Sequence, residues 1–274
     1  MYRQRLAGTP VTTDSARRLQ NRLLSYHDFR QHKSQHPLAR GLAALGDWQA
    51  ARLRHTHADL YHQPGYHQGL EFLLTDLYAP AGMTRRDDNL DRIFPRIVKW
   101  LPENLQDTLA GLVELNHVTQ RLDLTLLENL AALGLPAADL TIGALDDQTY
   151  CEAFRAGDPD ERERQIALVA EVGQQLDRYV RNRSLGWLLS MSRAPAEMAE
   201  LSDLHSFMYR GYRAFQAMER VDRLIKEVVR RESEVMARIL AGHPAPFSVA
   251  TEAQPHNGEG PGVRPDRSAG RAGS

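Results

Sequence analysis

The sequence is poor in cysteine, in net charge and in long apolar runs. Cys151 is the single cysteine among 274 residues, so no disulfide can form within the chain. The formal net charge of −1 gives no general attraction to nucleic acid or to acidic partners. No stretch approaches the roughly 20 consecutive apolar residues that span a bilayer, and the first residues lack the apolar run of a secretory signal. These absences predict a cytoplasmic protein without a membrane segment.

Common catalytic signatures are absent as well. The sequence has no Walker loop, no G-x-G-x-x-G, no G-x-S-x-G and no paired C-x-x-C. Glu114 and His117 form one E-x-x-H, but a ferritin-type di-iron site needs two such motifs and two further glutamates. We therefore predict no catalytic residue, no metal site and no cofactor, and a non-enzymatic protein is favoured although an enzyme is not excluded.

What the sequence does have is apolar residues at helical spacing, in long stretches separated by proline and glycine. The longest predicted helix runs from about Glu103 to Leu133, where leucines keep one stripe over roughly eight turns. Asp158-Pro159 marks another helix start, with an N-cap acid and then proline at the first position. A last helix is expected from about Val221 to Leu240. Since no stretch alternates as a strand does, we predict an all-α, single-domain bundle of about eight to ten helices.

Composition divides the chain into three parts. Residues 1–36 carry far more basic than acidic side chains and are predicted to form a basic N-terminal helical arm. Residues 37–242 are predicted to form the helical bundle. Residues 243–274 are rich in Pro, Gly, Ser and Ala, which predicts a disordered tail. The basic charges of the arm surround its helix without interleaved aromatic residues, so a solvated face is favoured over nucleic-acid binding.

A polar seam lies within the leucine stripe of the longest helix. At about 100° per residue, Asn116, Thr119 and Asp123 project among the leucines. Buried polar groups need partners, so we expect these side chains to bond to an arginine or to neighbouring backbone. Two interpretations stay open: a structural hydrogen-bond network, or the wall of a polar pocket.

The stretch from Leu70 to Asp87 is expected to hold a helix with a firm end. Its apolar face carries Asp76 at the edge, and Ala79-Pro80 ends the helix because the residue before proline avoids the α region. We predict that Asp76 pairs with Arg85 or Arg86 and fastens the intervening loop. In the alternative interpretation Asp76 and the two arginines belong to the polar pocket.

The same stretch resembles a motif of an uncharacterised all-helical bacterial protein family, of the type Phe-Leu-Thr-Asp-Leu-Tyr-x-Pro. The residues that carry the resemblance are Phe72-Leu73-Leu74-Thr75-Asp76-Leu77-Tyr78-Ala79-Pro80 with Arg86-Asp87, then Arg164-Gln165-Ile166, Val172-Gly173, Leu176 and Arg193-Ala194-Pro195. The resemblance covers roughly residues 40–240. It implies an all-helical fold, and because no activity is established for the family it implies no chemistry.

The apolar residues of the last helix allow two structures. Val221, Ile225, Val228, Val235 and Ile239 hold heptad spacing, with Glu232 breaking one position. This pattern fits a packed terminal helix and a dimer seam equally well.

Three functions therefore remain open. The first is a non-enzymatic cytoplasmic interaction or regulatory protein, with a protein partner or a second copy on its last helix. The second is a ligand-binding protein or enzyme with a polar pocket between helices, lined by Asp76, Arg85, Arg86, Asn116, Thr119 and Asp123. The third is weak nucleic-acid binding through residues 1–36.

Overall fold

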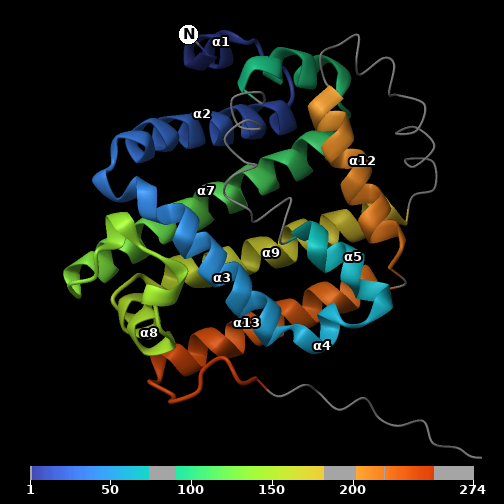
Figure 1. Ribbon diagram of the computed structural model, residues 1–274. Coiled ribbons are helices and arrows are strands. Elements are labelled where there is room, and N and C mark those ends of the chain that lie inside the picture. The colour runs from blue at the N-terminus through green and yellow to red at the C-terminus, as the bar shows by residue number, and fades with distance from the viewer. Residues whose placement is uncertain (1, 74–90, 182–201, 219, 250–274) are drawn as a thin grey trace, which may run out of the picture.

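The computed structural model describes residues 2–73, 91–181, 202–218 and 220–249. Every regular element in these ranges is a helix, which confirms the predicted all-α fold (Figure 1). The α-helices are α1 (Tyr2–Gly8), α2 (Asp14–Gln35), α3 (Leu42–Thr56), α4 (Ala58–Tyr61), α5 (Pro64–Phe72), α7 (Glu103–Ala132), α8 (Asp147–Arg155), α9 (Pro159–Val180), α12 (Ser202–Gln216) and α13 (Val221–Leu240). Residues 91–100 are also helical, and 3-10 turns span Pro37–Gly41, Ala137–Asp139 and Ile142–Ala144. Across these ranges, no helix combines the length and apolar character that crossing a membrane requires.

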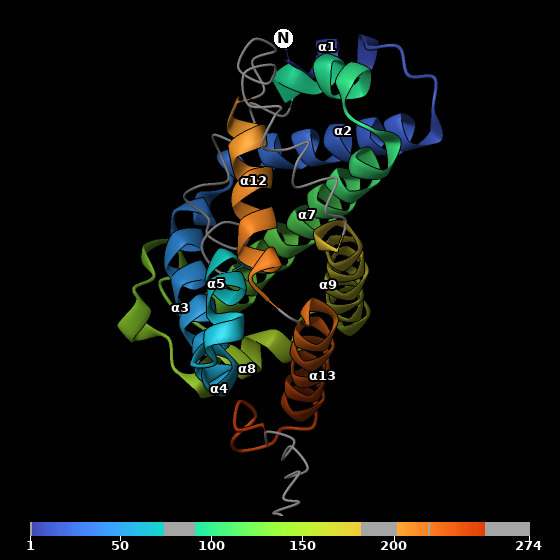
Figure 2. The same ribbon diagram turned by 90° about the vertical axis from the view of Figure 1, so that its right-hand side faces the viewer.

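The long helix α7 is the centre of the fold. It packs against α2, α9 and α3, while α13 packs on α9 and α12 packs on α5. Figure 1 shows α7 and α9 between α2 above and α13 below, and Figure 2 shows α3, α4 and α5 together on one side of the molecule. Much of the predicted leucine stripe of α7 is buried, with Leu122, Leu126 and Leu130 each 5% exposed or less, whereas Leu133 at its end is 48% exposed. Burial of this stripe places α7 in contact with helices from both halves of the chain.

Short polar side chains set the starts of several helices. Asp158 Oδ1 accepts hydrogen bonds from the backbone N–H groups of Asp160 and Glu161, at 2.9 Å and 3.4 Å, so α9 begins where the sequence predicted. Asp146 caps α8 in the same way through the N–H of Thr149, at 2.7 Å. The predicted bounds of α7 and α13 and the predicted start of α9 agree with the structure within about two residues.

Both ends of the described chain contribute to the packing. In the predicted N-terminal arm, Leu19, Leu23 and Tyr26 of α2 are buried against α7 and residues 91–100, because this helix has an apolar face beside its basic one. The predicted tail starts at residue 243, yet Phe247 is only 6% exposed and lies with its ring 6.1 Å from those of Trp48 and Tyr150. The packed chain therefore continues through Phe247. Residues 250–274 of the predicted tail lie outside the described residues.

The heptad residues of α13 face into the bundle. Val221, Ile225, Val235 and Ile239 are between 1% and 5% exposed. Their pattern is thus accounted for by the packed terminal helix, with α9 as its main neighbour. Dimerisation through the last helix stays a prediction, and it would have to use other residues of the α13 surface.

The helices α9 and α13 approach closely at Gly173. A Cβ at this position would lie 2.6 Å from Cγ2 of Ile225, well inside contact distance. We expect Gly173→Ala to lower the free energy of unfolding by about 1–3 kcal/mol, the usual cost of overpacking, as measured by urea denaturation. Gly65→Ala in α5 is the matched control, because a Cβ there meets nothing within 4 Å and replaces glycine by a better helix former. An unchanged free energy of unfolding in Gly173→Ala would show that the crossing tolerates a methyl group.

Candidate functional site

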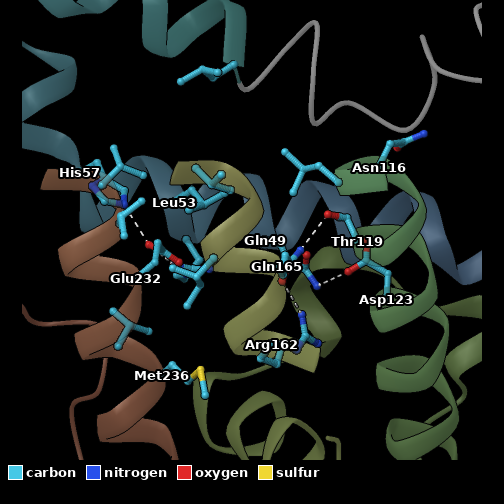
Figure 3. Close-up of a pocket in the computed structure, with 18 of the residues that line it drawn as sticks. Gln49, Leu53, His57, Asn116, Thr119, Asp123, Arg162, Gln165, Glu232 and Met236 are labelled. Atoms are coloured by element: carbon cyan, nitrogen blue, oxygen red, sulfur yellow. Dashed lines mark hydrogen bonds and ion pairs between the residues drawn. The ribbon is translucent and has the colours of Figure 1, made fainter. Parts of the chain in front are cut away.

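A partly open cavity of about 290 Å³ lies between α3, α7, α9 and α13. Its apolar wall includes Leu53, Leu112, Leu115, Ile166, Val169, Val228 and Val229. Two groups of its polar side chains lie on opposite sides of the space in Figure 3. We call Gln49, Thr119, Asp123, Arg162 and Gln165 the seam cluster, and Arg52, His57 and Glu232 the Glu232 cluster.

The seam cluster joins three helices through side-chain hydrogen bonds. Gln49 Nε2 of α3 donates to Asp123 Oδ1 of α7 at 3.0 Å, and Gln165 Nε2 of α9 donates to Thr119 Oγ1 of α7 at 2.8 Å. Arg162 Nη1 donates to Gln165 Oε1 at 3.4 Å (Figure 3). The structure thus brings together two of the predicted seam residues, Thr119 and Asp123. Their partners are mainly amides on facing helices, where we had expected an arginine or backbone.

The third seam residue, Asn116, belongs to a second network. Its Nδ2 donates to the phenolic oxygen of Tyr26 at 2.6 Å, and its Oδ1 accepts from Gln120 Nε2 at 2.9 Å. Gln120 Nε2 also reaches Tyr26, at 2.7 Å, and Lys33 Nζ donates to Gln120 Oε1. Asn116, Gln120 and Lys33 line the cavity, but Figure 3 shows Asn116 apart from the seam cluster. This network extends the polar wall toward α2.

Burial changes the protonation of Asp123. It raises the pKa of this carboxyl from 3.8 to about 6, although Arg162, the hydrogen bond from Gln49 and the charge of Lys33 act in the opposite direction. A carboxyl with such a pKa can hold or release a proton near neutral pH. Chemically, the seam cluster therefore offers one titratable acid, one guanidinium and two amides on a single wall.

In the Glu232 cluster, the carboxylate of Glu232 is paired with Arg52 and His57. Arg52 Nη1 donates to both carboxylate oxygens of Glu232, at 2.7 Å and 2.6 Å, and His57 Nε2 lies 2.9 Å from Oε1. Burial alone would raise the pKa of Glu232, but Arg52 and His57 outweigh it and lower the pKa to about 2. Glu232 is thus a fixed negative charge at neutral pH, joining α13 to α3.

Several cavity residues lie outside the predicted polar seam, and those on α9 and α13 have a signal in the sequence. On α9, Arg162, Gln165, Ile166 and Val169 follow the i, i+3, i+4, i+7 spacing of one helix face. Glu232 interrupts the heptad pattern of α13. An acid at an otherwise inward position of a helix indicates a buried ion pair, which the structure shows.

Three of the predicted site residues are not placed. Asp76, Arg85 and Arg86 lie outside the described residues, so their pairing and their membership of a pocket stay predictions. Within the described ranges, no group of three or more His, Cys, Asp or Glu side chains has an arrangement that could hold a metal ion.

Fold and site together define a helical bundle with a partly polar cavity between its helices. The chain belongs to the family described as domain of unknown function (DUF8198), whose model matches residues 28–246. This match contains all the lining residues named above, from Lys33 to Val229 and Glu232. Comparison with the curated proteins and with the solved structures gave no match.

Proposed function

We propose that this protein binds a small organic molecule in the cavity between α3, α7, α9 and α13. The observation that carries the proposal is the convergence of hydrogen-bonding side chains from three helices on one space with apolar walls. Sites for small molecules have this composition: a mainly apolar lining with a few placed polar groups that fix orientation.

The size of the cavity supports binding of a molecule larger than a single ring. Its volume of about 290 Å³ is near the lower end of the ~300–1,000 Å³ range of ligand sites. It is also about twice the ~150 Å³ of an engineered apolar cavity that binds benzene. Leucine and valine side chains that border such a space lack packing partners on one side, and an apolar ligand would supply those contacts.

We favour ligand binding over the binding of a partner through α13, because α13 buries its apolar residues within the chain. Catalysis in the same cavity would require a group that reacts with the ligand. Asp123 is the cavity residue whose pKa suits a general base, yet its present hydrogen bond engages Gln49. We therefore propose binding as the function.

A thermal-shift screen of the purified full chain against a library of small metabolite-like compounds tests this proposal. A compound at 100 times its Kd adds about 2.7 kcal/mol to the stability of the folded state. For a chain of this length we expect the Tm to rise by about 5–10 °C.

Two variants decide whether a hit occupies the cavity. Val169→Phe and Val228→Phe fill it from α9 and from α13, and either variant that keeps the helical circular dichroism should lose the shift. Ala167→Phe adds the same ring on the exposed side of α9 and should keep it. A shift that persists in the filled variants would place the ligand elsewhere and contradict the proposal.

A further inference from the structure

We infer that the ligand is an apolar molecule with a single carboxylate, and that Arg162 binds this carboxylate. The inference rests on the proposed binding function and adds the chemical class of the ligand. It is carried by the charge balance of the cavity, by the surroundings of Arg162 and by the order of residues along α9.

The charge balance of the lining favours an anion. The described lining residues include four cationic side chains, Lys33, Arg52, Arg54 and Arg162, and two carboxylates, Asp123 and Glu232, which leaves an excess of two positive charges. The charge of Glu232 is already matched by Arg52 at 2.6 Å. A negative group that enters the cavity is therefore attracted.

Arg162 is the cation best placed to receive that group. Its guanidinium lies 4.7 Å from the ring centre of Phe154 and has one long hydrogen bond, to Gln165. Within the described part of the chain it makes no ion pair with a carboxylate at 4 Å or less. An arginine fork has five N–H donors and matches the two oxygens of a carboxylate, so most of its donors are open to a ligand.

The neighbouring Asp123 favours a single negative charge over a dianion such as a phosphate monoester. The charged and titratable groups that face its carboxyl are Arg162 of α9, Lys33 of α2 and Tyr150 of α8. Because the pKa of Asp123 is about 6, a small further increase in this pKa leaves the carboxyl protonated at neutral pH. A ligand carboxylate nearby would cause that rise, and protonated Asp123 can then donate a hydrogen bond. A second ligand charge would be repelled by the carboxylates of Asp123 and Glu232 in the same lining.

The apolar body of the ligand has a continuous wall to follow. Ile166 and Val169 lie on the same face of α9 as Arg162, and the seven-residue step to Val169 corresponds to about 10 Å along the helix. Val228 and Val229 of α13 line the cavity as well. An alkyl chain or a ring attached to the carboxylate can therefore pack between α9 and α13.

Isothermal titration calorimetry of the full chain with hexanoate, octanoate and decanoate, and with the matching 1-alcohols, tests this inference. We expect octanoate to bind about 10- to 100-fold more tightly than 1-octanol, as a charge-assisted hydrogen-bond pair would provide. Affinity should rise about fourfold with each added CH2 until the cavity is filled.

Substitution of Arg162 separates the carboxylate from the apolar body. Arg162→Gln should weaken octanoate binding at least tenfold and leave 1-octanol binding unchanged. Arg162→Lys, which keeps the charge and removes the fork, should weaken octanoate binding less. Arg178→Gln, on the exposed side of the same helix, is the control that should change neither affinity.

The outcomes distinguish this inference from the proposed function. Equal affinities for acid and alcohol, or octanoate binding that is insensitive to both Arg162 variants, would overturn the assignment of a carboxylate and leave the cavity proposal standing. Failure of the wild-type chain to bind any acid of the series would overturn the inference too. The thermal-shift screen with Val169→Phe and Val228→Phe tests the cavity proposal separately.

Discussion

Arg231→Met is expected to lower the free energy of unfolding by about 3–5 kcal/mol, the range for breaking a buried ion pair. Arg231 lies on α13 with 1% of its surface exposed. Its guanidinium donates to both oxygens of Asp59, at 2.6 Å and 2.8 Å, to Glu227 at 2.7 Å and to the backbone oxygen of Thr56 at 3.1 Å. The methionine would leave the Asp59 carboxylate and the Thr56 carbonyl without this partner, between α13 and the start of α4.

The measurement is urea denaturation followed by circular dichroism at pH 7. The neighbouring Arg230→Met is the control, because Arg230 pairs with Glu227 and Glu234 along the same helix, is about one-third exposed, and should cost no more than about 1 kcal/mol. The double variant Arg231→Met with Asp59→Asn should recover part of the loss, since it removes the abandoned charge. Losses of equal size in Arg230→Met and Arg231→Met would contradict a buried role for Arg231.

Asp123→Asn is expected to raise the free energy of unfolding by about 3 kcal/mol at pH 7.5. The pKa of Asp123 is about 6 in the folded chain, against an ordinary value of 3.8. Above pH 6 the carboxylate is charged in both states, and its charge is costlier in the folded one, so a difference of about 2 pKa units corresponds to about 3 kcal/mol. Asparagine keeps an acceptor for Gln49 and removes the charge.

The sign of this effect can be checked against pH. The unfolded chain releases the proton of Asp123 from about pH 4 and the folded chain only near pH 6, so wild-type stability should fall between these values through this group. The gain from Asp123→Asn should accordingly shrink to well under 1 kcal/mol at pH 4. Glu232→Gln provides the opposite case: its pKa is lowered to about 2, so the variant should lose stability at pH 7.5. A gain from Asp123→Asn that is the same at both pH values would show that the proton is not responsible.

Much of the fold could be predicted because its signals are local. Caps and the spacing of apolar residues predicted α7, α9 and α13, and projection around α7 placed Asn116, Thr119 and Asp123 on one polar line. The chain between Pro37 and Tyr61, in contrast, is divided into a 3-10 turn, α3 and α4. Its break at His57 has no proline or glycine to announce it. There the Thr56 carbonyl accepts from Arg231 and His57 meets Glu232, contacts that come from about 175 residues away.

The candidate site was less predictable for the same reason. Asn116, Thr119 and Asp123 could be placed on one face, but their partners depend on how helices pack. Gln49 lies 74 residues from Asp123, and Gln165 lies 46 residues from Thr119. The spacing of residues along one helix carries no information on pairs between helices. It does predict which face of a helix points inward, so the inward face of α9 could have been recognised from the sequence.

The position of α13 also determines when the cavity exists. Its Glu232 meets Arg52 across a separation of 180 residues, and Arg231 meets Asp59 across 172. During synthesis α2, α3, α7 and α9 therefore leave the ribosome before the helix that supplies one wall of the cavity. Until then the apolar sides of α9 and α3 have no α13 to cover them. The nascent chain thus passes through a stage at which it exposes apolar surface and cannot hold a ligand, and that stage ends only when residues 221–240 have left the ribosome and packed on α9.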